Sequence, residues 1–290
     1  MAAAERGDEM LGTAFPAARL LLVEQPAGWV RTGLGGSGFD PAVARRLTER
    51  ISRLGVRVLA VRRPGRRPDD AGGRRWGFAD CRPGRSAMAS GWYDDPAELL
   101  DLDPDALPLA ASPPVYLVCT HGTHDLCCAV AGRPVAAALA EECPDRVWEC
   151  SHVGGDRFAA NVLVLPTGQL YGRVTDPAEL LAATEAGRVL PARLRGRIGL
   201  SPAAQAAVVH GQRELGLLTP DAITVEGITE RPPDVQLVRI SSVAGAGTVA
   251  VRRVAGDRAR LTCRAVRDAV PLSYRPLWLR LDPSPDRGGP

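Results

Sequence analysis

Cysteine and histidine side chains gather in two blocks of this 290-residue chain, at residues 115–135 and 147–174. The two blocks hold four of the seven cysteines and three of the four histidines. Thiolate sulfur and imidazole nitrogen are the ligands that zinc, other soft metals and iron–sulfur clusters use in proteins. A metal or iron–sulfur site is therefore expected in these blocks.

The sequence around the first block favours an anionic group such as an iron–sulfur cluster. Cys119 ends a strand-like apolar run, and Cys128 precedes a helix that we expect to begin near Pro134. The free N–H groups and the positive dipole end of a helix N-terminus stabilise a nearby negative charge. Four glycines allow the backbone to approach such a group closely: Gly122, Gly132, Gly154 and Gly155.

The residues before these blocks predict a βαβ unit. Apolar runs at 19–25 and 56–63 predict two buried strands, and the amphipathic stretch 40–54, which opens with Asp-Pro, predicts a helix between them. Such a unit has parallel strands and a right-handed crossover, and it begins an α/β lobe. Residues 64–112 are rich in Pro, Gly, Arg and Asp and contain few periodic runs, so we expect the junction between two lobes there.

A second lobe and a small β unit follow. Strands are predicted at 115–119, 147–152, 160–166 and 169–174, and helices at 134–142 and 177–187. This order of elements fits a thioredoxin-like layout. After a further helix capped by Ser201, apolar and polar residues alternate over 223–265, which predicts a small antiparallel appendage.

Composition narrows the function classes. The formal charge is +3, from 36 basic and 33 acidic residues, and every basic residue is arginine. We therefore expect no nucleic-acid surface, and we interpret the arginines that begin at Arg62 as a solvated loop, with a docking face for an acidic redox partner as the alternative. No apolar stretch is long enough to span a membrane, and the N-terminal residues lack the apolar core of a signal peptide. A cytoplasmic location is expected.

The odd number of cysteines argues against a disulfide framework. Cytosolic thiols are normally reduced, so the seven cysteines need another explanation. An isolated cysteine is usually a small buried hydrophobic residue. This is the interpretation for Cys81, Cys143 and Cys263.

Three sequence blocks resemble the sucrase/ferredoxin-like family: LGTAFPAARLLLVEQPAGW, VCTHGTHDLCCAVAGRPVA and SHVGGDRFAANVLVLPTGQLYGRV. The resemblance spans about residues 11–216 and implies two thioredoxin-like lobes, with a 2Fe-2S cluster in the second. A C-x8-C loop and an H-x3-H motif hold the cluster in that family. These motifs place ligands at Cys119, Cys128 and His152, whereas the second histidine position is Asp156.

The fourth ligand is open between two residues. Asp156 follows a Gly-Gly turn that lets it fold back toward His152, although a carboxylate is a harder ligand than thiolate or imidazole. Cys150 is the alternative, because strand alternation places residues 150 and 152 on the same face. The residues expected to line the cluster or to lie just outside its ligands are Gly154, Gly155, Arg157, His121 and His124.

The expected organisation has three parts. They are an N-terminal thioredoxin-like lobe at 11–112, a thioredoxin-like ferredoxin lobe with the cluster at 113–200, and a helix with the β appendage at 201–290. The predicted function is electron transfer or redox sensing by a 2Fe-2S protein, rather than catalysis on a substrate of its own. A redox protein is the expected partner, and neither nucleic acid nor a membrane is expected to bind.

Two other functions fit parts of the sequence. A zinc-stabilised thioredoxin-like binding module would use the same side chains, because two cysteines, a histidine and a carboxylate can form a tetrahedral zinc site. An NADP-dependent oxidoreductase would use Gly33, Gly35 and Gly38, which satisfy G-x-G-x-x-G, and Arg62-Arg63 for the 2′-phosphate. The gap between the first strand and Gly33 is longer than the tight turn of that motif.

Overall fold

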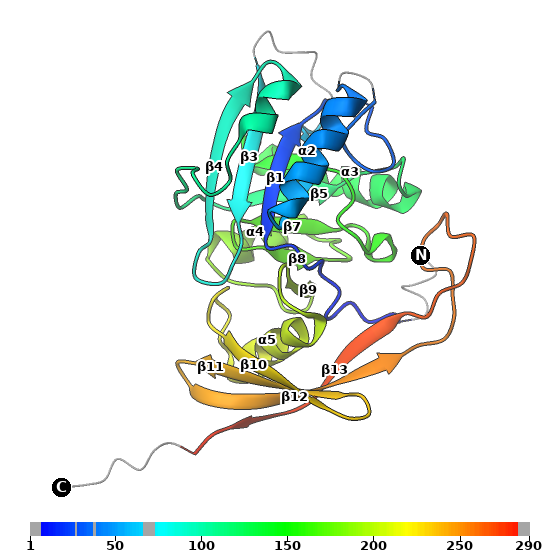
Figure 1. The fold of residues 1–290 in the computed structure, drawn as a ribbon. Coiled ribbons are helices and arrows are strands. Elements are labelled where there is room, and N and C mark those ends of the chain that lie inside the picture. Colours follow the sequence, from blue (N-terminus) through cyan, green and yellow to red (C-terminus); the bar gives the residue numbers. More distant parts are fainter. Residues whose placement is uncertain (1–6, 27, 37–38, 66–72, 284–290) are drawn as a thin grey trace, which may run out of the picture.

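The computed structural model describes residues 7–26, 28–36, 39–65 and 73–283. These residues form a mixed α/β protein with one nine-stranded mixed sheet and a separate four-stranded antiparallel sheet (Figure 1). The α/β class and the C-terminal antiparallel appendage are thereby confirmed.

The strands and helices of the described residues are named here in chain order. Its strands are β1 (Arg19–Glu24), β2 (Val56–Arg62), β3 (Arg74–Asp80), β4 (Ala87–Tyr93), β5 (Val115–Cys119), β6 (Val147–Cys150), β7 (Val162–Leu165), β8 (Gln169–Tyr171) and β9 (Leu194–Arg197). The helices are α2 (Pro41–Arg53), α3 (Leu126–Glu142), α4 (Pro177–Glu185) and α5 (Pro202–Leu215), with short 3-10 helices η1 (Pro96–Asp101) and η2 (Asp156–Phe158). The small sheet contains β10 (Thr224–Arg231), β11 (Val235–Ser242), β12 (Gly245–Ala255) and β13 (Leu272–Leu281).

One strand order occurs twice in the large sheet, which runs β4-β3-β1-β2-β6-β5-β7-β8-β9. We call residues 19–101 the first half and residues 115–185 the second half. In each half, two parallel strands are connected by a helix, and two antiparallel strands extend the sheet on one side. The halves meet at β2 and β6, which pair antiparallel through Val61 with Cys150 and Arg62 with Glu149.

Alternation along β1 divides its side chains between two cores. Leu21 and Val23 pack with the buried face of α2. The intervening Leu20 and Leu22 belong to another core cluster, which also contains Leu117 of β5. Because successive strand side chains point to opposite faces, the first half packs its helix on one face and shares the other face with the second half.

Helix α3 begins earlier than the sequence predicts. The expected start near Pro134 is wrong, because the helix starts at Leu126 and Pro134 lies inside it. Asp125 is the N-cap, and its side chain accepts a hydrogen bond from the backbone N–H of Cys127. Cys128 therefore lies within the first helical turn instead of in the loop before it.

Two strands that the sequence does not predict lie in the segment 64–112, where the junction between lobes is expected. Residues 64–112 contain the strands β3 and β4, and β3 pairs directly with β1, so this segment extends the first half of the sheet. Their sequences, RRWGFAD and AMASGWY, mix charged, small and aromatic residues and lack a clear period of two. Residues 258–263 form no strand, and the last strand of the small sheet is β13.

Helix α5 connects the small sheet to the rest of the chain. It lies between β9 and the small sheet, as Figure 1 shows. Ala203, Ala206 and Ala207 of this helix pack with Val238 and Ile240 of β11 in one core cluster. The small alanine side chains let the helix approach the sheet closely.

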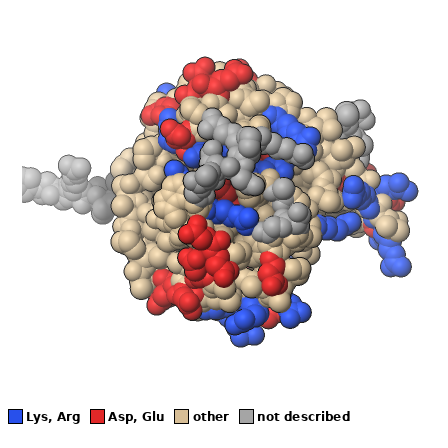
Figure 2. Space-filling model, turned by 90° about the horizontal axis from the view of Figure 1, so that it is seen from above, with Lys and Arg blue, Asp and Glu red and all other residues tan. Residues whose placement is uncertain are grey.

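The described residues include no helix with the length and apolar character needed to cross a membrane. Charges are mixed on the face seen in Figure 2, where acidic and basic side chains are interspersed. That face is therefore not uniformly basic, which agrees with the nearly balanced composition.

Candidate metal centre

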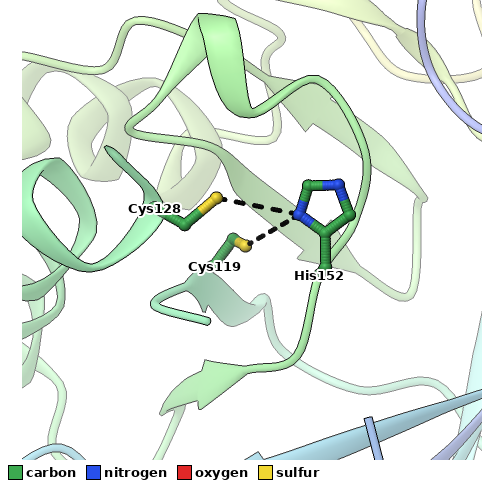
Figure 3. A group of neighbouring side chains, drawn as sticks. All are labelled: Cys119, Cys128 and His152. Carbon is green, nitrogen blue, oxygen red and sulfur yellow. Dashed lines mark hydrogen bonds between the residues drawn. The ribbon is translucent and has the colours of Figure 1, made fainter. Parts of the chain in front are cut away.

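Three of the predicted ligands lie together, and we call Cys119, Cys128 and His152 the metal triad. The Sγ atoms of Cys119 and Cys128 lie 4.0 and 3.7 Å from Nδ1 of His152. Their donor atoms all fall within 4.8 Å of one another. Figure 3 shows both sulfurs directed at one nitrogen of the imidazole, whose other nitrogen points away from them.

The sheet and α3 bring the metal triad together. β5 and β6 are parallel neighbours, and Cys119 pairs with Cys150 at their carboxyl ends, so residues that follow β6 lie beside Cys119. Helix α3 packs tightly on the end of β5 at Gly132. A Cβ atom at Gly132 would lie 2.2 Å from the carbonyl oxygen of Cys119, so glycine is needed for this approach. The approach sets Cys128 beside Cys119.

The two buried thiols affect each other's protonation. A hydrogen bond from Cys128, assisted by His152, holds the pKa of Cys119 well below its usual range despite burial. The same hydrogen bond and burial raise the pKa of Cys128. The metal-free pair thus favours one thiolate and one thiol, whereas a bound cation favours two thiolates.

His121 supports His152 from behind. Its Nδ1 accepts a hydrogen bond of 3.1 Å from the backbone N–H of His152, and its Nε2 lies 3.0 Å from the carbonyl oxygen of Val30. This pattern requires a neutral ring with the proton on Nε2, and burial lowers the pKa of His121 to about 4. Because both ring nitrogens are engaged, His121 positions His152 and is not itself a ligand.

His124 packs on the ring of His152. The two imidazole rings are stacked, with centroids 3.7 Å apart and an interplanar angle of 16°. Nδ1 of His124 lies 3.1 Å from the carbonyl oxygen of Arg31. His121 therefore contacts the backbone of His152, and His124 contacts its ring.

Residues of the first half also hold this region. Arg57 of β2 donates a hydrogen bond of 2.7 Å to the carbonyl oxygen of His152. In loop 28–36, Gly33 lies against the side chain of Ser151, with its virtual Cβ 3.6 Å from the hydroxyl oxygen. The glycine-rich loop thus packs on the chain that carries His152.

Of the residues predicted to bind a dinucleotide, those that the structure describes are engaged in contacts within the protein. The side chain of Gln25 binds both the N–H and the carbonyl oxygen of Gly35, at 3.2 and 2.8 Å, so that N–H is not free for a phosphate. Arg62 donates a hydrogen bond of 2.6 Å to Glu149. Gly38, the third glycine of the motif, lies outside the described residues.

Comparison with known families adds to this geometry. Residues 40–196, from the N-cap of α2 into β9, match the sucrase/ferredoxin-like family. The chain belongs to this family. The match includes all of the metal triad, and it confirms the family that the sequence blocks resemble. No curated protein and no solved structure matches the chain.

In this sucrase/ferredoxin-like protein, neither candidate for the fourth ligand joins the metal triad directly. Asp156 begins η2 and is 5% exposed, and its Oδ2 has no hydrogen-bond partner in the described structure. Burial, followed by the neighbouring Asp125, raises the pKa of Asp156 to about 6. Cys150 is fully buried, and burial raises the pKa of its thiol well above the usual value. The choice between them stays a prediction.

Arg195 is a functional candidate that the sequence analysis missed. It lies in β9 and is 1% exposed. Its guanidinium donates to the carbonyl oxygens of Gly154 and Thr13, to the Thr13 hydroxyl and to Oδ1 of Asn161, all of which are neutral acceptors. Burial lowers the pKa of Arg195 to about 9, and the negative charge of the Cys119 thiolate raises it in part. A buried cation that binds neutral acceptors suits a neighbouring anionic group.

Of the residues predicted to line the cluster, two glycines contact Arg195, and Arg157 forms an ion pair. Gly155 has a left-handed backbone with φ of 68°, and a Cβ atom there would lie 2.5 Å from the Arg195 guanidinium. The carbonyl oxygen of Gly154 is one of the acceptors of Arg195. Arg157 lies 3.6 Å from Asp8 in an ion pair and stacks on Phe158.

The isolated cysteines differ from one another in burial. Cys81 and Cys143 are buried, as expected for small hydrophobic residues. The same interpretation is wrong for Cys263, which is exposed, because it lies in the irregular connection between β12 and β13 and not in a strand.

Proposed function

We propose that the protein binds a 2Fe-2S cluster at Cys119, Cys128 and His152 and acts as a one-electron carrier or redox sensor. The observation that carries the proposal is the convergence of two sulfurs and one imidazole nitrogen within 4.8 Å, at the N-terminus of a helix. When bound, the cluster supplies a site for reversible one-electron reduction.

The surroundings of the metal triad fit an anionic group. Arg195 provides a buried positive charge whose hydrogen bonds all go to neutral acceptors. The first turn of α3 adds the positive end of a helix dipole beside Cys128. The Asp156 carboxyl shares a hydrogen bond with Asp125, but its buried Oδ2 has no partner in the described structure, which supports Asp156 as the fourth ligand.

The repeated strand order supports a finer assignment of the fold. We propose that both halves are thioredoxin-like and that the lobes follow the expected boundaries at 11–112, 113–200 and 201–290. The support is the repeated strand order, β2-β1-β3-β4 in the first half and β6-β5-β7-β8 in the second. The antiparallel pairing of β2 with β6 then relates the two lobes edge to edge.

A redox protein is the proposed partner. His152 and the His124 ring stacked on it are both half-buried, so the site lies near the surface. Leu126 and Val130 of α3 are 60% and 61% exposed on the same helix face, and Arg133 is exposed one turn further on. An apolar contact edged by positive charge suits a partner with an acidic surface.

A zinc-stabilised binding module is the second candidate, because the same three donors suit tetrahedral zinc. Anaerobic purification followed by absorption spectroscopy and analysis of iron, sulfide and zinc separates the two. The proposal predicts a brown protein with equal amounts of iron and inorganic sulfide. A colourless protein with zinc and no sulfide would establish the alternative.

A further inference from the structure

A second group of metal-binding side chains lies beside the start of α3. It consists of Asp125, Cys127 and Cys263, whose donor atoms all lie within 4.8 Å of one another. None of these residues belongs to the metal triad. We call them the second group. Its members come from segments more than a hundred residues apart in the sequence, so the tertiary fold creates the site.

The second group is built around a buried carboxylate. Asp125 is 0% exposed, and its two oxygens accept hydrogen bonds from the backbone N–H groups of Cys127 at 2.9 Å and Cys263 at 2.8 Å. Arg264, which follows Cys263 in the sequence, donates a hydrogen bond of 3.0 Å to the carbonyl oxygen of Thr123. These contacts fix the connection between β12 and β13 against the first turn of α3.

The donor set indicates the kind of cation. The Asp125 carboxylate also makes side-chain hydrogen bonds with the Cys263 thiol and with Asp156. Each carboxylate oxygen has two lone pairs, so loss of the thiol proton of Cys263 frees a lone pair of Asp125 for a metal. Two sulfurs and one oxygen suit zinc, whereas magnesium and calcium prefer oxygen alone. Two sulfurs on one zinc lie roughly 3.8 Å apart, and the donor atoms of this group already lie within 4.8 Å of one another. A disulfide needs them at about 2 Å.

We propose that Asp125, Cys127 and Cys263 form a second metal site, for zinc or a similar divalent cation. Binding releases the thiol protons to solvent and leaves a fourth position for water. Cys263 is exposed and Cys127 is half-buried, so the cation can enter from solvent. The bound ion would tie the small sheet to the helix turn that carries Cys128.

The test uses the full chain with its native metal retained, in reducing and anaerobic buffer. Zinc sulfate is added in competition with a chromophoric chelator, and zinc and iron per chain are measured in the same sample. Cys263→Ser is expected to bind one zinc fewer than the wild type, with iron unchanged. Cys127→Ser should behave in the same way, and Cys143→Ser, at the other end of α3, should match the wild type.

The result separates this site from the metal triad. If the triad itself binds zinc, the total rises by one, but the loss in Cys263→Ser is still one zinc. Equal zinc in the wild type and Cys263→Ser overturns the proposal.

Discussion

The two halves of the large sheet share one strand order but differ in the residues at the same structural positions. The second half has the metal triad at the end of β5, at the third residue of α3 and two residues after β6. Counted from the matching element ends, the first half has Glu24, Val43 and Pro64. Both helices begin after an aspartate N-cap, Asp40 in one and Asp125 in the other.

This comparison shows that the fold creates the place for a site and the side chains decide its chemistry. The first half has the same strand ends and helix N-terminus but no cysteine or histidine there. Instead it supports the site of its neighbour, through Arg57 and through the loop at Val30 and Gly33. In the proposed function, one half thus offers the metal ligands, and the other half contacts the chain that carries them.

The largest expected effect is the loss of iron when a thiolate of the second half is removed. Cys119→Ser and Cys128→Ser should each lose nearly all of the iron, because a neutral hydroxyl replaces a thiolate ligand. Cys81→Ser is the control, since Cys81 is buried near the end of β3 in the first half. Iron analysis of the purified variants checks this. Iron retained in Cys128→Ser would move the site to Cys127.

A smaller loss is expected at the fourth ligand. Asp156→Ala should labilise the iron, while Asp156→His should restore stable binding through the H-x3-H spacing of the family. Cys150→Ala is the comparison, because Cys150 pairs with Val61 at the junction of the halves. The rate of iron release to a chelator distinguishes them. Rapid release from Cys150→Ala, with Asp156→Ala like the wild type, would assign the ligand to Cys150.

Arg195 should tune the site without binding metal. Arg195→Gln removes a buried positive charge, which disfavours addition of an electron, so the midpoint potential should fall. At an effective dielectric of about 20, a unit charge at a distance of roughly 8 Å contributes on the order of 2 kcal/mol. Arg195→Lys keeps the charge and should stay near the wild-type potential. A potential that is equal in Arg195→Gln and in the wild type, at equal iron content, would show that Arg195 has only a structural role.

The smallest effect concerns Asp156 in the metal-free protein. Its folded pKa of about 6 lies above the ordinary aspartate value of 3.8, so the folded state keeps a proton that the unfolded state has lost between these values. Stability therefore falls as pH rises through this window and stays lower above it. Asp156→Asn should raise the free energy of unfolding at pH 7 by on the order of 1–2 kcal/mol, with little change at pH 4.

Denaturant unfolding of the metal-free variants at both pH values measures this difference. Glu142→Gln, at an exposed position of α3, is the control and should change stability little at either pH. An Asp156→Asn variant that is no more stable than the wild type at pH 7 would contradict the proposed cost of this carboxylate.

Local sequence was sufficient to predict the strands that end at the site. The run VYLVC is apolar and bounded by turn residues, so both β5 and the position of Cys119 could be predicted. The start of α3 was not predictable in the same way, because Pro134 resembles a helix start while the true cap, Asp125, stands among histidines and cysteines.

The tertiary contacts of the site could not be read from the sequence. Arg195 lies in the short segment LRGR, whose local sequence resembles an exposed strand, and only the packed structure shows that it is buried beside Gly154 and Gly155. The pairing of Asp125 with Cys263 joins segments far apart in the chain, and it has no local signature.

The most direct test of mixed cysteine and histidine ligation is pulsed EPR of the protein after one-electron reduction. The account predicts a paramagnetic 2Fe-2S signal with strong coupling to a nitrogen nucleus, and loss of that coupling in His152→Cys while the iron is retained. A protein without an EPR signal after reduction, or a nitrogen coupling unchanged in His152→Cys, would contradict it.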